Sequence, residues 1–217
     1  KVFKTIRKPN VLVIGDIMLD TFIIGKHAGK SPEGPIPLIK KKKEYSTAGA
    51  AALVALCVNK IGGQSFLIGG LGNEQSAGEL KFQLKKNKVK RYIVTDRKSV
   101  TTNKVRIFSD QKALLRLDCE SSFSISKEKK MKLKKIILTK MKSSNVIIVS
   151  DYRKGFCSKE ILKFIIINAN KLQIPMLLDT RKNANDFNIY KNSYCIKPNF
   201  FEAKSIYKNL KRNDKSL

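Results

Sequence analysis

Two carboxylates follow the first apolar run of the sequence. The run Val11–Ile14 has the composition of a buried β-strand, and Asp16 and Asp20 come directly after it in VLVIGDIMLD. An unpaired buried charge is costly, so acids at this place need a reason. One interpretation is that the strand ends at Gly15 and Asp16 caps a turn, since Asp is common in turns. The other is that the acids hold a polar ligand at the carboxyl end of a parallel strand.

The pattern of an apolar strand followed by an acid recurs later in the chain. Asp151 follows the apolar run in NVIIVSD, and Asp179 follows the run in PMLLD. The carboxyl ends of parallel strands meet at one edge of a sheet, where open α/β proteins bind ligands. We therefore expect Asp16, Asp151 and Asp179, together with Asn199, to open onto one crevice at that edge. The sequence contains no GxxxxGK[ST], and no GxGxxG follows the first strand, which excludes a P-loop and a dinucleotide-binding Rossmann site.

The elements that must position these acids alternate between strand-like and helix-like segments. This order predicts an α/β fold with a mainly parallel sheet flanked by helices. Two stretches, about 21–44 and 99–120, are strand-like with polar residues at alternate positions, which is typical of a sheet with one solvated face. We expect them to pair in one small antiparallel sheet beside the main one.

The composition is that of a globular, strongly basic chain. It has 217 residues, a hydrophobic fraction of 42% and a formal net charge of +28. The lysines are spread along the whole chain without the interleaved aromatic residues of RNA-binding motifs, so we favour solvated lysine-rich faces over a nucleic-acid surface. No apolar run approaches the ~20 residues that span a bilayer. No small-residue cleavage site follows the first apolar run, and we expect a cytoplasmic protein.

The cysteines and the single histidine do not form a metal-binding pattern. Cys57, Cys119, Cys157 and Cys195 are scattered without a CxxC motif, and His27 lies in GKHAG. These spacings exclude the usual zinc sites. We expect buried free thiols in a reducing compartment and a loop position for His27.

Several segments resemble the ribokinase-like (PfkB) sugar kinases, and among them the heptose 7-phosphate kinase domain of the bifunctional heptose kinase/adenylyltransferases. The segments cover nearly the whole chain, and they are VLVIGDIMLD, SPEGPIPLIK, AGAAALVA, TTNKVRIFSDQKALLRLDCE, SDYRKG, LLDTRK and KPNFFEA. The resemblance implies one ribokinase-like domain over residues 1–217, with the stretches 21–44 and 99–120 forming a small β lid over the sugar. It also implies ATP-dependent phosphorylation at C1 of D-glycero-D-manno-heptose 7-phosphate to the 1,7-bisphosphate. That reaction feeds ADP-heptose and lipopolysaccharide core synthesis.

The resemblance also implies roles on the sugar side of the site. Asp16 and Asp20 would lie at the sugar, with Asp16 binding its hydroxyl groups. Gly49 would let the backbone approach the sugar closely, which glycine permits. Lys104 and Arg106 would bind the phosphate of the sugar. A homodimer formed through the lid is the partner that the resemblance suggests.

On the nucleotide side, the resemblance implies binding of ATP and Mg²⁺. Asn199, Phe200, Phe201 and Glu202 match the NxxE element that lies near the triphosphate and its magnesium ion. Lys154 in SDYRKG would face the same crevice.

Each of these roles has a structural alternative. Lys104 and Arg106 alternate on a strand and would do so on any solvated face. Asn199 is a good helix N-cap, and Glu202 three residues later would complete a capping box. Arg116 and Asp118 would be explained by a cross-strand ion pair.

The sequence also departs from the resembling pattern. Leu53 stands where the family has an asparagine that contacts the sugar, and Thr180-Arg181 replaces Pro-Lys after Asp179. The catalytic base would belong to a Gly-Ala-Gly-Asp element beyond Leu217, so we expect that this chain as given does not turn over heptose 7-phosphate. It would then be a fragment or a decayed copy. A non-catalytic sugar-phosphate-binding or dimerisation module and, less favoured, a basic nucleic-acid binder are the alternatives.

Overall fold

The computed structural model describes residues 8–180 and 189–213, with side chains up to residue 208. The strands are β1 (Asn10–Lys30), β2 (Pro37–Gly49), β3 (Gln64–Leu71), β4 (Lys90–Thr95), β5 (Thr102–Ser109), β6 (Lys112–Cys119), β7 (Val146–Asp151), β8 (Met176–Thr180) and β9 (Cys195–Ile196). The helices are α1 (Ala50–Lys60), α2 (Gln75–Lys86), α3 (Lys127–Met141), α4 (Lys159–Lys171) and α5 (Phe200–Asn213). Strands and helices alternate along most of the chain, as the sequence predicts.

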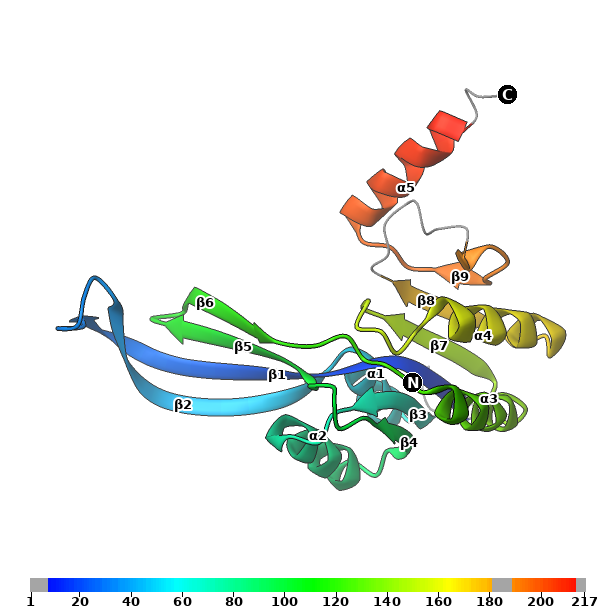
Figure 1. Ribbon diagram of the computed structural model, residues 1–217, viewed down its shortest axis with the longest axis horizontal. Helices are drawn as coiled ribbons and strands as arrows, with labels where there is room; N and C mark the ends of the chain where they lie inside the picture. The colour runs from blue at the N-terminus through cyan, green and yellow to red at the C-terminus, as the bar shows by residue number, and fades with distance from the viewer. Residues whose placement is uncertain (1–7, 181–188, 214–217) are drawn as a thin grey trace.

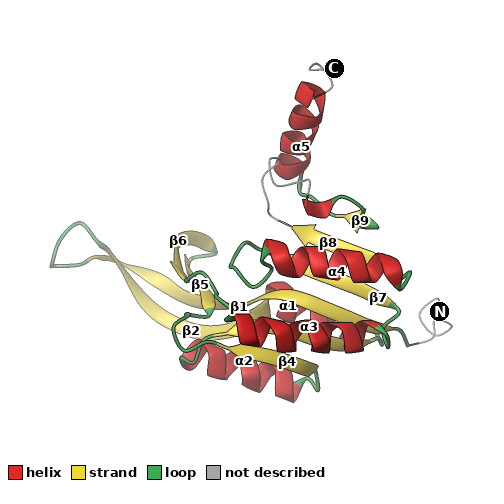
Figure 2. Cartoon of the chain, turned by 45° about the vertical axis from the view of Figure 1, so that its right-hand side comes forward, coloured by secondary structure: helices red, strands yellow, loops and turns green. Residues whose placement is uncertain are grey.

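The central sheet has the strand order β4-β3-β1-β7-β8-β9, and every pairing within it is parallel. Helices cover both of its faces, with α3 and α4 in front of the sheet and α1 behind it in Figure 2. A sheet covered on both faces needs strands that are apolar on both sides. Residues 11–19 of β1 are accordingly all buried. The mainly parallel α/β sheet expected from the sequence is confirmed.

The two faces of the sheet carry separate hydrophobic cores. Successive side chains of a strand point to opposite faces. Leu12 and Ile14 therefore pack in the cluster that contains Leu133 of α3 and Ile161 of α4. Val11 and Val13 pack in the other cluster, among the residues of α1 and α2.

The first strand does not end where the sequence suggests. The first of the two interpretations of Asp16, that the strand ends at Gly15 and a turn follows, is wrong, because β1 continues without a break to Lys30. Its first part pairs with β3 and β7 in the central sheet, up to Asp16 opposite Gly70. From Met18 onwards it pairs with β2 and β5 instead. Figure 1 shows the strand running from between the helices out to one side of the molecule.

The outer part of β1 forms a four-stranded extension with β2, β5 and β6, and we call these strands the extension. Its strand order is β2-β1-β5-β6. The stretches 21–44 and 99–120 thus contribute to one sheet. The expectation that this sheet is antiparallel throughout is wrong for one pair, because β1 and β5 run parallel, while β2 with β1 and β6 with β5 are antiparallel. It is also continuous with the central sheet through β1 instead of standing beside it.

The described cysteines differ from the expectation of buried thiols. Cys157 is buried, but Cys57, Cys119 and Cys195 are exposed free thiols. Cys57 lies on the exposed side of α1, whose buried residues include Ala55 and Val58, whereas Cys119 lies on β6, where all residues are exposed. Among the described residues, no helix is both long enough and apolar enough to cross a membrane.

Candidate functional site

The predicted acids do lie at one edge of the central sheet. Gly15 of β1 is level with Ser150 of β7, and Ser150 is level with Asp179 of β8, so Asp16 and Asp151 both stand at the carboxyl end of their sheet pairings. The expectation that all of these acids open onto a crevice is wrong for two of them. Asp16 is 2% exposed and Asp151 is 1% exposed.

Asp16 is occupied by the backbone of the loop 152–156. Its Oδ2 accepts the amides of Tyr152 at 2.7 Å and Lys154 at 3.1 Å, and its Oδ1 accepts the amide of Phe156 at 3.3 Å. Burial raises the pKa of Asp16 from its ordinary value of 3.8 to about 6, and the like charge of Asp151 adds to the rise, although the three backbone hydrogen bonds oppose it. The structure thus gives this carboxylate a structural set of partners, and the predicted sugar contact of Asp16 stays a prediction.

Asp20 lies on the opposite side of the strand junction, on one face of the extension. Its carboxylate forms an ion pair with Arg106 of β5, at 2.6 Å between Oδ1 and Nη1. A Cβ added to Gly49 would lie 2.3 Å from Oδ2 of Asp20, so only glycine leaves room for this carboxylate. The neighbour that the structure shows for Gly49 is thus Asp20, and the predicted approach of the Gly49 backbone to the sugar stays a prediction.

Aromatic rings support the Asp20–Arg106 pair from the same face. The guanidinium of Arg106 lies over the ring of Phe22, 5.5 Å from its centroid. Phe22 stacks in turn on Tyr45 of β2 and on Phe108 of β5, with centroid distances of 5.0 and 6.3 Å. A guanidinium on an aromatic face is favourable and orients the planar donor groups. These rings were not among the residues predicted from the sequence, because only the register of β1, β2 and β5 brings them together.

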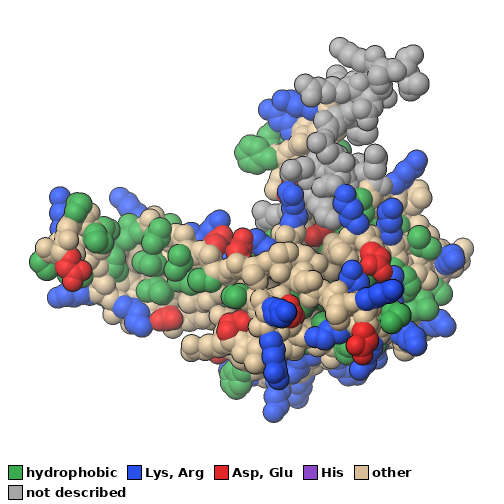
Figure 3. Space-filling view, viewed as in Figure 1, with side chains coloured by type: hydrophobic (Ala, Val, Ile, Leu, Met, Phe, Trp, Pro, Cys, Tyr) green, Lys and Arg blue, Asp and Glu red, His purple; other side chains and the backbone are tan. Residues whose placement is uncertain are grey.

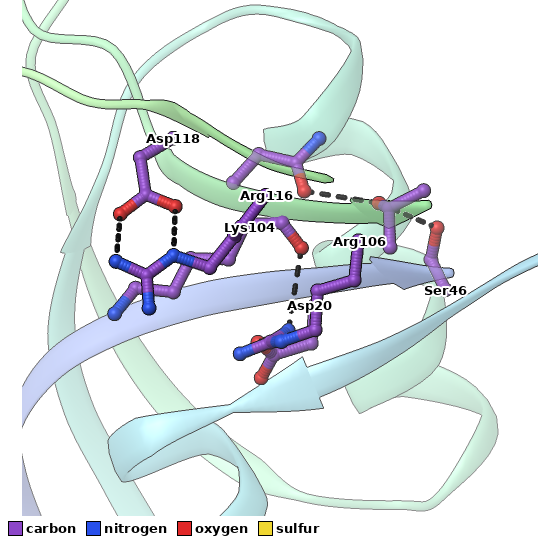
Figure 4. A network of polar contacts seen from close by, with 8 residues as sticks. Asp20, Ser46, Lys104, Arg106, Arg116 and Asp118 are labelled. Atoms are coloured by element: carbon purple, nitrogen blue, oxygen red, sulfur yellow. Dashed lines mark hydrogen bonds and ion pairs between the residues drawn. The ribbon is translucent and has the colours of Figure 1, made fainter. Parts of the chain in front are cut away.

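Further cations lie on the same face, and we call Asp20, Lys104, Arg106, Arg116 and Asp118 the basic face (Figure 4). Lys104 is level with Asp20 on one side and with Asp118 on the other. Arg116 and Asp118 form an ion pair at 2.9 Å, but the expected cross-strand geometry is wrong, because both residues lie on β6 two positions apart. Among the described residues, no carboxylate pairs with the ammonium group of Lys104. The basic face therefore holds three cations against two acids, an arrangement suited to a phosphate group.

The other face of the extension is different. A cavity of about 570 Å³ lies between the extension and α2, and its lining includes Thr21, Glu44, Glu79 and Asn103. Thr21 bonds to Ser46 at 3.0 Å and to Asn103 at 2.9 Å. Because side chains alternate along β1, Thr21 points away from Asp20. The residues that line this cavity include no lysine or arginine. We place the candidate site on the basic face because its charges match a sugar phosphate.

The residues expected on the nucleotide side lie beyond β9, at the start of α5. The amide of Asn199 donates to Glu202 at 2.7 Å, and the amide of Glu202 donates to Asn199 at 2.9 Å. These two bonds form the capping box that the sequence offers as an alternative. Phe200 and Phe201 are 73% and 80% exposed and meet edge to face. Nucleotide binding by these residues stays a prediction.

Lys154 and Asp179 both form ion pairs with other residues of the protein. The ammonium of Lys154 pairs with Glu120, just past β6, at 2.5 Å. The carboxylate of Asp179 accepts a hydrogen bond from Tyr152 and pairs with Lys197 at 3.0 Å, which raises the pKa of Lys197. Lys154 thus contacts the end of the extension, while Arg181, one of the departures noted above, lies outside the described residues.

The described residues do not identify a magnesium site. Within residues 8–180 and 189–213, no group of three or more histidine, cysteine, aspartate or glutamate side chains could hold a metal ion. The one carboxylate expected near the magnesium, Glu202, accepts a hydrogen bond from the Asn199 amide. The expected loop position of His27 is wrong, because His27 lies within β1, where its side chain is exposed.

Comparisons with known proteins agree with this fold. The pattern of the pfkB family carbohydrate kinases matches residues 8–216. The Bifunctional protein HldE of Aliarcobacter butzleri is 34% identical over 198 residues, covering 91% of this chain and 41% of the relative. The protein of the same name from Blochmanniella pennsylvanica is 33% identical, covering 100% of this chain and 44% of its own length. The chain therefore spans less than half the length of these curated relatives.

Solved structures share the architecture at low sequence identity. Phosphofructokinase-2 from Escherichia coli, in complex with substrates and products, superposes with a TM-score of 0.71 at 16% identity, over 93% of this chain and 64% of that one. Ribokinase from Arabidopsis thaliana, complexed with ribose and ATP, gives a TM-score of 0.58 at 17% identity, over 80% and 54%. These likenesses show the ribokinase-like fold, and the family pattern spans nearly every residue of the sequence. The chain belongs to the pfkB family of carbohydrate kinases.

Proposed function

We propose that the protein is a sugar kinase that acts on D-glycero-D-manno-heptose 7-phosphate, with ATP as phosphoryl donor and magnesium as its companion ion. The observation that carries the sugar side is the basic face, where Asp20 is paired with Arg106 and the Lys104 ammonium has no carboxylate partner among the described residues. A carboxylate accepts hydrogen bonds from sugar hydroxyl groups, and clustered lysine and arginine bind phosphate. The relatives named HldE and the segments quoted above support heptose as the sugar.

In this proposal the extension is the lid over the sugar. Its basic face is the sugar-phosphate surface, and Arg106 orients Asp20 through their ion pair at 2.6 Å. The guanidinium of Arg106 also lies over the ring of Phe22, which limits its orientation. The chain's own residues thus bind and orient the sugar phosphate, and a closed lid would exclude water from it. ATP supplies the phosphoryl group when bound.

Binding of the sugar is the first test. Isothermal titration of the 217-residue chain with heptose 7-phosphate should show saturable binding. The same heptose without phosphate should bind at least ~10-fold more weakly, because a charge-assisted hydrogen bond to phosphate contributes about 1.5–3 kcal/mol. Equal affinity for the two sugars would remove the basic face from the proposal.

Turnover is the second test. A coupled assay of ADP release with heptose 7-phosphate, ATP and Mg²⁺ measures whether the chain as given is active. We expect no activity above the rate without enzyme, because the resemblance implies that the catalytic base belongs to a Gly-Ala-Gly-Asp element, which these 217 residues do not contain. Activity would show that the base lies among these residues, and activity only in a version with the Gly-Ala-Gly-Asp element would support a fragment.

A homodimer through the extension is a second proposal, and a specific surface favours it. Leu115 and Leu117 of β6 are 58% and 54% exposed, and Ile36 and Leu38 at the far end are exposed as well. Figure 3 shows apolar side chains gathered over the extension, with lysine and arginine side chains along its margins and over the rest of this face. Light scattering should give twice the chain mass, and Leu115→Lys with Leu117→Lys should give a monomer. A monomeric parent chain would contradict it.

Because the lysines are scattered along the chain, we predict that the protein has no surface for binding nucleic acid. A fluorescence-anisotropy titration with random DNA at physiological salt should show no binding tighter than about 1 µM, since non-specific binding is usually weaker than that. Sub-micromolar binding would reverse the order of the candidate functions.

A further inference from the structure

The loop 152–156 has the backbone geometry of an anion-binding nest. Arg153 and Gly155 have positive φ angles of 62° and 99°, so the amides of the residues between and beside them turn toward one side. Successive backbone N–H groups in such conformations form a concavity that binds anions. A Cβ added to Gly155 would lie 2.3 Å from the carbonyl oxygen of Phe123, so glycine is needed there on two grounds. The anion in this nest is the chain's own Asp16, through the amides of Tyr152, Lys154 and Phe156.

Asp16 stands at the point where β1 leaves the central sheet. It is the last residue of β1 that pairs with β3, opposite Gly70. Met18 is the first that pairs with the extension, opposite Gly49 on β2 and Thr102 on β5. The nest therefore holds the strand at the joint between the two sheets. Asp20 follows within the same strand, on the extension side.

The loop that holds Asp16 also contacts the extension directly. The amide of Phe123 donates to the carbonyl oxygen of Lys154 at 2.7 Å. The ammonium of Lys154 pairs with Glu120 at 2.5 Å, and Glu120 follows the last residue of β6. The loop is thus bonded to β1 through Asp16 and to the end of β6 through Lys154. The loop therefore connects β1, at the joint, with the end of β6.

The space beside Asp16 is too small for a sugar. The cavity that Asp16 lines with Gly70, Thr101 and Lys154 has a volume of about 10 Å³. One water molecule needs about that much room, and ligand pockets are typically larger than ~300 Å³. In this arrangement the hydrogen-bond partners of the Asp16 carboxylate are backbone amides of the protein itself.

We propose that Asp16 is a positioning residue, whose carboxylate in the nest of loop 152–156 fixes the joint of β1 and thereby sets the orientation of the extension and of Asp20 and Arg106. The same loop also holds the end of β6 in place, through the ion pair between Lys154 and Glu120. The proposal rests on the function proposed above for the basic face, because the consequence of a misplaced joint is weaker binding of the sugar phosphate. The nest itself is independent of that function.

The variant Asp16→Asn tests the proposal. Asparagine has one acceptor oxygen and an N–H₂ group in place of the second oxygen, so at least one of the three nest amides loses its partner. The matched control is Asp110→Asn, an exposed acid in the β5–β6 turn with a φ angle of 48°, where asparagine is well tolerated. Residue-resolved hydrogen exchange by NMR on the full chain is the first readout, and the affinity for heptose 7-phosphate is the second.

We expect the protection factors of the Tyr152, Lys154 and Phe156 amides to fall by about tenfold or more in Asp16→Asn, because a lost hydrogen bond to a charged group has that effect. The amides of β5 around Lys104 should lose protection as well, while those of α3 around Leu133 keep it. The dissociation constant of heptose 7-phosphate should rise by about tenfold. A merely structural role would lower protection everywhere, including α3, and that result would overturn the proposal.

The outcomes separate the nest from the proposed function. Unchanged protection at residues 152–156 would overturn the nest. Faster exchange there with unchanged sugar affinity would overturn the positioning role. Should the parent chain not bind heptose 7-phosphate, the proposed function fails, and exchange in β5 alone decides whether the joint is fixed by Asp16.

A second variant covers the case in which Asp16→Asn does not fold. Lys154→Met keeps the loop amides and removes only the ion pair with Glu120. We expect the nest amides to stay protected and the amides of Glu120 to Phe123 to exchange several-fold faster. Unchanged exchange in that segment would overturn the link between the loop and the extension.

Discussion

Asp16 and Asp20 lie on one strand, and they have opposite surroundings. Asp16 is buried in the central sheet and accepts three backbone amides. Asp20 is on the open face of the extension and pairs with Arg106 at 2.6 Å. The chemistry of the two side chains is the same, so their different roles come from where β1 places them. A carboxylate surrounded by backbone orders the fold, whereas one beside a guanidinium on an open face is available to a ligand.

The pH dependence of stability gives the largest expected effect in this comparison. Because burial raises the pKa of Asp16 from 3.8 to about 6, its contribution to folding is fully present below about pH 3.8 and is lost as the pH rises through about 6. The lost stability corresponds to about 3 kcal/mol. Denaturant unfolding between about pH 4 and pH 7 should show the free energy of unfolding of the parent chain falling by that amount relative to Asp16→Asn. The Asp110→Asn variant should follow the parent chain, and parallel curves for the parent and Asp16→Asn would contradict the assignment.

Removing the partner of Asp20 gives the next largest effect, on binding instead of stability. Arg106→Met keeps an unbranched apolar side chain at this position and removes the guanidinium that lies over Phe22. We expect the dissociation constant of heptose 7-phosphate to rise by about 30- to 100-fold, because charge-assisted hydrogen bonds to phosphate are lost and Asp20 is left without its counter-ion. Isothermal titration measures this.

Arg97→Met is the control for Arg106→Met. Arg97 is an exposed arginine in the turn after β4, and it is not one of the five residues of the basic face. It should leave the affinity within about twofold, since exposed single charges contribute little. Equal losses in the two variants would show that the phosphate is attracted by the net charge of the chain and not by the basic face.

The sequence predicts the sheet better than it predicts the joint. Apolar runs followed by acids locate β7 and β8 and their shared edge, because strands buried on both faces are uniform in composition. The continuation of β1 through Gly15 and Asp16 was missed, because both residue types are typical of turns. The nest was missed as well, because Asp16 and its amide donors are separated by more than a hundred residues of sequence. The only local sign of the nest is Gly155, two residues after Arg153. This glycine indicates an anion-binding loop only when Asp16 is known to lie beside it.

The candidate site was predicted in part for the same reason. Lys104 and Arg106 were named from the family resemblance, and their alternation on one strand explains why they share a face. Their support by Phe22, Tyr45 and Phe108 depends on the register of three strands, which no local pattern fixes. The capping box at Asn199 and Glu202 was predicted, because its two hydrogen bonds join residues three apart.

Substitution of Leu53 should have a smaller effect on the affinity for heptose 7-phosphate. Leu53 is 47% exposed in the first turns of α1, four residues after Gly49, and the resemblance noted in the sequence implies an asparagine at this position. We expect Leu53→Asn to lower the dissociation constant of heptose 7-phosphate by about tenfold, because a sugar hydroxyl group would gain a hydrogen-bond partner. Ile61→Asn at the other end of α1, where Ile61 is 67% exposed, should have no effect on affinity. No difference between the two variants would remove position 53 from the sugar site.

Ala50 gives the smallest effect, at the joint itself. It has a φ angle of 50°, a left-handed conformation that costs an L-residue with a Cβ about 1–2 kcal/mol, and it bridges to Ile17, which lies between Asp16 and Asp20. Ala50→Gly should remove that strain, although the greater freedom of glycine in the unfolded chain offsets part of the gain. We expect the free energy of unfolding to rise by about 0.5–1 kcal/mol, measured by denaturant titration at neutral pH. Ala51→Gly, at a buried helical position, should instead lower it by at least about 1 kcal/mol. If Ala50→Gly is destabilising too, the left-handed residue is not strained, and the joint is held by Asp16 and its nest without opposition from α1.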